Sequence, residues 1–183
     1  LTKRLDPAKG FSRVLQFSRV GESGESYAFD SEGILVSASR FEDDLRNIGL
    51  LGIEQSSVMN IQIRDPGGDM TEGFLSDTPR SQQMFTHMAA SAFSNIGVPD
   101  LVGSAFEGGN LSVETGMEGY RDYRGVPVYG AWFWNNNLGL GLTSEIDVVE
   151  ALATFYTIRM LFFIVFGVTL LLSLGGTFFV LAT

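Results

Sequence analysis

The most constraining feature of this chain is its last stretch, which runs from Met160 to Ala182 without a charged residue. At about 1.5 Å of rise per residue, a helix over this stretch is roughly 34 Å long, and the hydrocarbon core of a bilayer is about 30 Å thick. All 21 acidic residues lie at or before Glu150. A buried helix of a soluble protein rarely reaches this length without a charge. The pattern therefore predicts a single-pass membrane protein with an acidic globular domain ahead of its transmembrane helix.

The composition of the chain limits its chemistry. The formal net charge is −9, and there is no cysteine. Because an acidic surface repels phosphate backbones, we expect no nucleic-acid partner. Without cysteine there is no disulfide, thiolate nucleophile or cysteine-ligated metal. Arg159 is the only charged residue after Glu150, and its side chain can reach lipid headgroups from either orientation of the span.

The first half of the domain shows short apolar patterns separated by turn signals. The turn at 31–33 lies between two β-prone runs, which predicts a hairpin. Pro79 is typical of a first helical position and Gly97 of a residue just past a helix end. The predicted elements are strands over 26–30 and 34–38, a helix over 41–50, a strand over 58–64 and a helix over 78–95.

The second half of the domain is rich in β-prone residues. Strands are predicted over 117–124, 126–134 and 138–143. The tetrapeptide Ser144-Glu145-Ile146-Asp147 has the pattern of a helix capping box. One helix over 145–182, roughly 57 Å long, would then join the last strand to the bilayer. The predicted organisation is a domain over 1–144, a connecting helix over 145–159 and a transmembrane helix over 160–182.

Three segments of the domain carry a family resemblance. The first is GESGESYAFD over 21–30, followed by Gly33 and by SRF over 39–41. The second is GYRDYRGVPVYGAW over 119–132. The third is GLGL over 139–142, which leads into SEID over 144–147 and then into Glu150 and Ala151. In this order, over most of residues 11–155, the chain resembles the Cache family of extracytoplasmic sensor domains, whose fold is PAS-like.

The resemblance implies an α+β fold, a PAS/Cache-like antiparallel sheet with flanking helices, followed by a long C-terminal helix that spans the membrane. In such proteins the final strands run into a helix that crosses the membrane to a kinase, cyclase or methyl-accepting module. It thus implies a receptor ectodomain on the periplasmic side of the inner cell membrane. These 183 residues contain no output module, so we expect either a segment of a receptor or a protein without signalling output. The amino-acid-binding pattern of the double-domain members is not reproduced.

The segment from Tyr120 to Arg124 is the strongest candidate for a ligand site, because it brings guanidinium, carboxylate and phenol groups together. On a strand, Tyr120, Asp122 and Arg124 would share one face, and Arg121 and Tyr123 the other. A face with an arginine and a tyrosine can clamp a carboxylate and stack on an aromatic ligand. Alternatively, Asp122 pairs with an arginine such as Arg40 and pins the sheet. The candidate ligand-binding residues are Arg40, Tyr120, Arg121, Asp122, Tyr123, Arg124 and Trp132.

Trp132 and Trp134 share one strand face, with Phe133 on the other. They would pack in a core, line the mouth of a pocket or contact a neighbouring protein. The residues alone leave these three roles open, and core packing is the commonest of them.

No catalytic or metal-binding constellation is apparent. His87, the only histidine, lies beside Met84 and Met88 without a cluster of acids, which is not typical of a metal site. Asp65, Asp69 and Glu72 surround a glycine pair but lack the spacing of a calcium loop, so a solvated turn is favoured. There is no nucleophile-elbow motif. We therefore expect a protein that is not an enzyme and holds no cofactor or metal.

Two functions from different classes remain. The first is a ligand-sensing ectodomain whose small-molecule ligand moves the C-terminal helix. The second is an accessory or scaffolding subunit of a larger membrane assembly, for instance a photosynthetic or respiratory complex. Small residues within the span allow another helix to approach closely and favour packing against integral membrane subunits or a homodimer partner, beside lipid. These residues are Gly167, Ser173, Gly175 and Gly176.

Overall fold

The computed structural model of the protein describes residue 15 and residues 19–97 and 113–182. The chain divides into two compact units, Leu1–Val148 and Val149–Thr183. Residues 1–14 of the predicted first domain lie outside the described residues.

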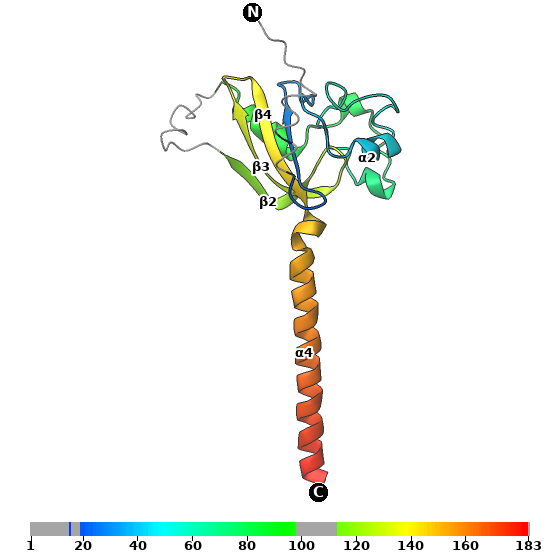
Figure 1. The fold of residues 1–183 in the computed structure, drawn as a ribbon, viewed down its shortest axis with the longest axis vertical. Coiled ribbons are helices and arrows are strands. Elements are labelled where there is room, and N and C mark those ends of the chain that lie inside the picture. The colour runs from blue at the N-terminus through cyan, green and yellow to red at the C-terminus, as the bar shows by residue number, and fades with distance from the viewer. Residues whose placement is uncertain (1–14, 16–18, 98–112, 183) are drawn as a thin grey trace, which may run out of the picture. The chain divides into compact units, whose positions relative to one another are not determined.

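The first unit is built on an antiparallel sheet of four strands in the order β1-β4-β3-β2 (Figure 1). The first strand of the chain therefore pairs with the last, and the three later strands follow one another as a meander. The strands are β1 (Glu25–Phe29), β2 (Glu114–Arg121), β3 (Pro127–Asn135) and β4 (Leu140–Asp147). The register between β2 and β3 shifts between Gly116 and Tyr120.

One face of this sheet forms the core of the unit. Along β3 every second residue is buried, which is the period of a strand with one face packed against other residues. Trp132 and Trp134 belong to this face, so the structure places both in the core. The helix α3 (His87–Ser94) packs on it through Met88 and other buried residues. The remaining members of the core are Tyr27, Phe29, Leu35, Leu45, Leu51, Ile61, Ile63, Ala89, Ala92 and Tyr123.

Besides α3, the described part of the segment between β1 and β2 contains three shorter helices. These are α2 (Glu42–Asn47), with Leu45 buried, and the 3-10 helices η1 (Met70–Glu72) and η2 (Arg80–Gln82). The predicted helix over 41–50 is thus present in shortened form. The predicted hairpin is reduced to a single bridge between Phe29 and Leu35.

Two predicted elements in this segment are wrong in extent. The helix expected over 78–95 begins only at His87, because Thr86 is extended and its hydroxyl caps the helix by accepting the Ala89 N–H. The strand expected over 58–64 is not continuous among the described residues, and single bridges tie Gln62 to Ile34 and Arg64 to Phe85. Tertiary contacts, rather than local propensity, decide both cases.

The predicted capping box is also wrong. Residues 144–147 belong to β4, whose backbone pairs with β1 on one side and β3 on the other. Glu145 does not return to a helix N–H; it points into the core, where its carboxylate accepts hydrogen bonds from Tyr27 and Tyr120. Two sheet neighbours and two phenols therefore outweigh the local capping pattern, and the helix begins at Val148 instead of Glu145.

The second unit contains the helix α4 (Val148–Ala182) from its second residue onward. This helix follows β4 without an intervening residue. Among the described residues it is the one helix long and apolar enough to cross a membrane. The guanidinium of Arg159 lies 4.9 Å from the ring of Tyr156 and 5.7 Å from the ring of Phe155. The α+β class, the antiparallel sheet with flanking helices and the long apolar C-terminal helix are thus confirmed, whereas the PAS/Cache identity stays a prediction.

Candidate functional site

A groove of about 580 Å³ runs beside the edge strand β2. Its walls combine β2 residues with a loop residue before η1 and the first residue of α3. The lining residues are Asp65, His87, Thr115, Gly116, Met117, Glu118, Gly119, Tyr120 and Arg121. The groove therefore offers a cation, two carboxylates, an imidazole and a phenol to a small molecule.

The charged wall of the groove is the ion pair between Arg121 and Asp65. The pair is bidentate, with Nε to Oδ1 at 2.8 Å and Nη2 to Oδ2 at 2.9 Å. Its side chains keep 45% and 24% of their surface exposed. A second hollow of about 280 Å³, which also includes Gln83 and Met84, is lined by both partners as well. The pair therefore borders both hollows and stays open to solvent.

The aromatic wall is Tyr120, whose side chain crosses the sheet from β2 towards β4. Glycines at 116 and 130 leave room for it, because a Cβ at Gly116 would lie 2.6 Å from the Tyr120 ring and one at Gly130 would collide with its hydroxyl. That hydroxyl donates to Glu145 at 2.7 Å. The ring packs edge-on against Trp132, with centroids 5.5 Å apart. Tyr120 thus joins the groove to the core strand that precedes α4.

Glu145 is a buried acid on β4, the strand between β1 and β3. Tyr27 and Tyr120 donate to its two carboxyl oxygens at 2.8 and 2.7 Å. Burial, and then the negative charge of Asp122, raise its pKa to about 8, although the two phenol hydrogen bonds favour the carboxylate.

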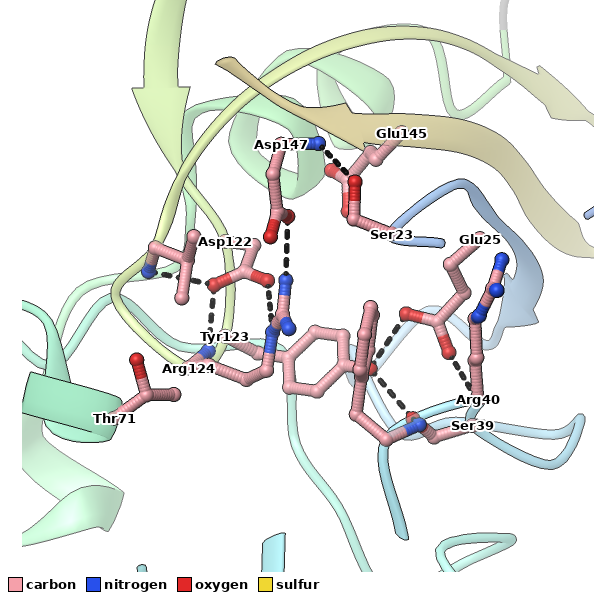
Figure 2. Close-up of polar contacts among 12 residues, drawn as sticks. Ser23, Glu25, Ser39, Arg40, Thr71, Asp122, Tyr123, Arg124, Glu145 and Asp147 are labelled. Carbon is pink, nitrogen blue, oxygen red and sulfur yellow. Dashed lines mark hydrogen bonds and ion pairs between the residues drawn. The ribbon is translucent and has the colours of Figure 1, made fainter. Parts of the chain in front are cut away.

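A second buried cluster surrounds Arg124 (Figure 2). Its Nε donates to Asp122 at 2.6 Å and its Nη2 to Asp147 at 2.8 Å. The backbone N–H groups of Arg124 and Val126 also donate to Asp122, and the guanidinium lies 3.5 Å from the ring centroid of Phe41. Burial raises the pKa of Asp122 to about 6 against the opposing effect of Arg124, so this carboxylate is ionised at neutral pH. The cluster fastens the turn after β2 to the last residue of β4.

A third buried carboxylate, Glu25, organises the start of the domain (Figure 2). It accepts the hydroxyl of Tyr123 at 2.6 Å and the backbone N–H of Arg40 at 2.6 Å. Ser39 shares a hydrogen bond of 2.8 Å with the same tyrosine hydroxyl. The guanidinium of Arg40 donates to the carbonyls of residues 21 and 24. These contacts hold loops of the domain together.

The candidate residues named from the sequence therefore separate into two groups. Tyr120 and Arg121 line the groove. Asp122, Tyr123 and Arg124 form buried contacts, and the predicted alternation of faces through Arg124 fails because β2 ends at Arg121 and the chain turns. Asp122 does form a structural pair with an arginine, the alternative that the sequence left open, but its partner is Arg124 rather than Arg40. Trp132 is 2% exposed and packs in the core behind the groove.

Two groove residues were missed as ligand candidates. The sequence favours a solvated turn at Asp65 and places His87 in the middle of a helix, whereas the structure has His87 as the first residue of α3. Asp65 and His87 lie beside β2 only because segments that are distant in the sequence contact one another, as in the hydrogen bond from Arg121 to Asp65. Asp69, from the same acidic group, caps η1 through Thr71. In the part of the chain that the structure describes, no three histidines or acids are grouped as a metal site.

Comparisons of the chain with known protein families, with curated proteins and with solved structures find no match. The Cache resemblance therefore stays a prediction.

Proposed function

We propose that this chain is the ligand-sensing ectodomain of a single-pass membrane receptor, with its domain on the extracytoplasmic side of the cell membrane. The observation that carries the proposal is the groove beside β2, whose aromatic wall is hydrogen-bonded to Glu145 in the strand that precedes α4. A small polar solute occupies this groove. The Cache resemblance of the sequence favours the same function.

The ion pair of Arg121 and Asp65 favours a small charged ligand. An anionic group competes with Asp65 for the guanidinium of Arg121, and a cationic group competes with Arg121 for the carboxylate of Asp65. Because the pair is partly exposed, its rearrangement does not bury an unpaired charge. Exposed pairs of this kind contribute only about 0–1 kcal/mol, so a ligand is able to replace them.

Tyr120 supplies a route from the groove to the helix. A ligand that moves its ring changes the contact with Glu145, which lies two residues before the end of β4. Asp147, the last residue of this strand, is held by Arg124. The ligand shifts the position of α4 only if it binds two arrangements of this strand with different affinity.

A thermal-shift screen tests the binding site. The full chain in detergent is heated with a panel of small carboxylates, amines and zwitterions, and unfolding is followed by tryptophan fluorescence, which reports on the domain because both tryptophans lie in β3. We expect at least one compound to raise the melting temperature of the wild type by several degrees. The increase should disappear in Arg121→Ala and Asp65→Ala, whose unliganded melting temperatures stay close to that of the wild type.

Arg46→Ala is the matched control, because Arg46 forms a partly exposed pair with Glu42 on α2 and does not line the groove. Its response to the compound should equal that of the wild type. If no compound shifts the wild type, or if Arg121→Ala responds like Arg46→Ala, this groove is not the ligand site.

The accessory subunit is the second candidate, and the surface of α4 favours it. At Gly167, Gly175 and Gly176, apart from the adjacent residues and the nearby backbone of α4 itself, no atom of the described residues lies within 4 Å of an added Cβ, so a neighbouring helix has space to approach. Extraction of native membranes in mild detergent, followed by size fractionation, tests this function. If α4 is an assembly surface, Gly175→Leu releases the protein from a complex that holds the wild type. Retention of the variant contradicts the idea.

A further inference from the structure

The buried carboxyl of Glu145 has an unusual set of partners. Both of its oxygens accept from phenols, Tyr27 on β1 and Tyr120 on β2. No ion pair of Glu145 occurs among the described residues, whereas the buried carboxylate of Asp122 is paired with Arg124. A carboxylate without a cation is strongly disfavoured in an apolar core, whereas the neutral acid is not.

The groups around Glu145 add negative rather than positive charge. Asp122, in the turn after β2, and Glu25, on β1, both disfavour the ionised form. The guanidinium of Arg124, in the same turn, is buried but already shared by Asp122 and Asp147. On β3 the residues of this face are Val128, Gly130 and Trp132, none of which titrates. From α3, His87 packs on the outer side of Tyr120, with ring centroids 5.8 Å apart.

We infer that Glu145 is a proton-binding site in the core, occupied at neutral pH, directly behind Tyr120, the aromatic wall of the groove. The neutral acid accepts one phenol hydrogen bond at its carbonyl oxygen and donates its own proton to the other phenol oxygen. When the proton leaves for solvent, both phenols can donate to the carboxylate, but its negative charge stays buried without a cation. Tyr120 connects this site to the groove, because it lines the groove and its hydroxyl is hydrogen-bonded to Glu145.

This proton site lies in the first unit and does not depend on a ligand. Its occupancy makes the stability of the domain depend on pH in one direction. The pKa of Glu145 rises from its ordinary 4.5 to about 8 in the folded domain, so the folded state keeps a proton that the unfolded state loses. Stability is therefore greatest below the unfolded value and decreases as the pH rises towards 8, with up to about a tenfold change in the unfolding constant per pH unit.

Urea unfolding of the full chain in detergent, followed by tryptophan fluorescence, tests the inference with Glu145→Gln. Glutamine resembles the neutral acid, because it offers one acceptor and one donor to the two phenols. The ratio of the wild-type unfolding constant to that of Glu145→Gln should rise by up to about tenfold per unit between pH 5 and pH 7.5. A ratio that stays constant over this range overturns the inference.

Infrared spectroscopy provides a second readout, even if Glu145→Gln folds poorly. The C=O stretch of a protonated carboxylic acid should vanish in the wild type between pH 7 and pH 9. Tyr120→Phe removes a hydrogen bond that favours the carboxylate, so the midpoint should move to higher pH. Tyr129→Phe is the control, since Tyr129 lies on the opposite face of β3, and its midpoint should match that of the wild type.

Two outcomes would contradict the proton site in this second measurement. One is a wild-type spectrum without a titrating acid band above pH 6.5. The other is an equal midpoint in Tyr120→Phe and Tyr129→Phe, which would assign the band to another carboxyl group.

Discussion

Arg121 and Arg124 lie three residues apart, and each forms an ion pair with an aspartate. The N–O distances of the two pairs are nearly the same, but one pair is partly exposed and the other is buried. Arg121 meets Asp65 at 2.8 Å at the groove, where its side chain is 45% exposed. Arg124 meets Asp122 at 2.6 Å in the interior, where its side chain is 4% exposed. The N–O distance therefore does not distinguish the two ion pairs, whereas the exposed fraction of their side chains does. A pair in water is exchangeable, and a buried pair is part of the scaffold.

The comparison predicts its largest effect for Arg124→Ala. Loss of this guanidinium leaves Asp122 buried without a cation and releases Asp147 at the end of β4. Breaking a buried pair in this way costs about 3–5 kcal/mol of unfolding free energy. Urea unfolding followed by tryptophan fluorescence measures the loss. A change below about 1 kcal/mol would remove the distinction between the two arginines.

Gly130→Ala should have an intermediate effect. The added methyl group collides with the hydroxyl of Tyr120 and crowds Glu145, and overpacking of a core costs about 1–3 kcal/mol. Because Tyr120→Phe removes the colliding atom, the double variant should be more stable than the sum of the two single changes predicts. If the change in unfolding free energy of the double variant equals the sum of the changes of Gly130→Ala and Tyr120→Phe, the side chain of Tyr120 does not lie across Gly130.

Arg121→Ala should have the smallest effect on stability. The pair with Asp65 is partly exposed, and such pairs contribute about 0–1 kcal/mol. The same unfolding measurement is made on Arg121→Ala and Arg124→Ala together. It compares one arginine-to-alanine change at the end of β2 with one in the turn that follows. A loss above about 2 kcal/mol would show that Arg121 is structural and would weaken the argument for a ligand site.

The sequence predicts the parts of the fold that depend on local or repetitive patterns. The apolar helix follows from uninterrupted composition, and the three late strands follow from runs of β-prone residues separated by turn signals, each within a few residues of its place. The wrong predictions share a different cause. The capping box at 144–147 fails because Tyr27, 118 residues earlier, donates to Glu145. No local pattern announces a partner at that separation.

The candidate site was predictable only in part for the same reason. The charged and phenolic side chains of Tyr120–Arg124 indicate the segment that borders the groove. The sequence also predicts a strand through Arg124, whereas β2 ends at Arg121 and the chain turns. That turn sends Arg121 outwards and Arg124 inwards. Asp65 and His87 come from separate segments and reach the groove only in the folded domain. A pair of glycines on neighbouring strands, Gly116 and Gly130, is the one sequence signal that would have indicated the path of Tyr120.

Amide hydrogen exchange of the full chain in lipid nanodiscs tests the central claim most directly, namely that the groove is connected to the strand that precedes α4. The measurement compares the chain with and without the compound that gives the largest thermal shift. We predict slower exchange in β2 and also in β4 (Leu140–Asp147), with both effects absent in Arg121→Ala. Protection confined to β2 and the loop of Asp65, with β4 unchanged, would contradict the claim and leave a binding groove without a connection to the helix.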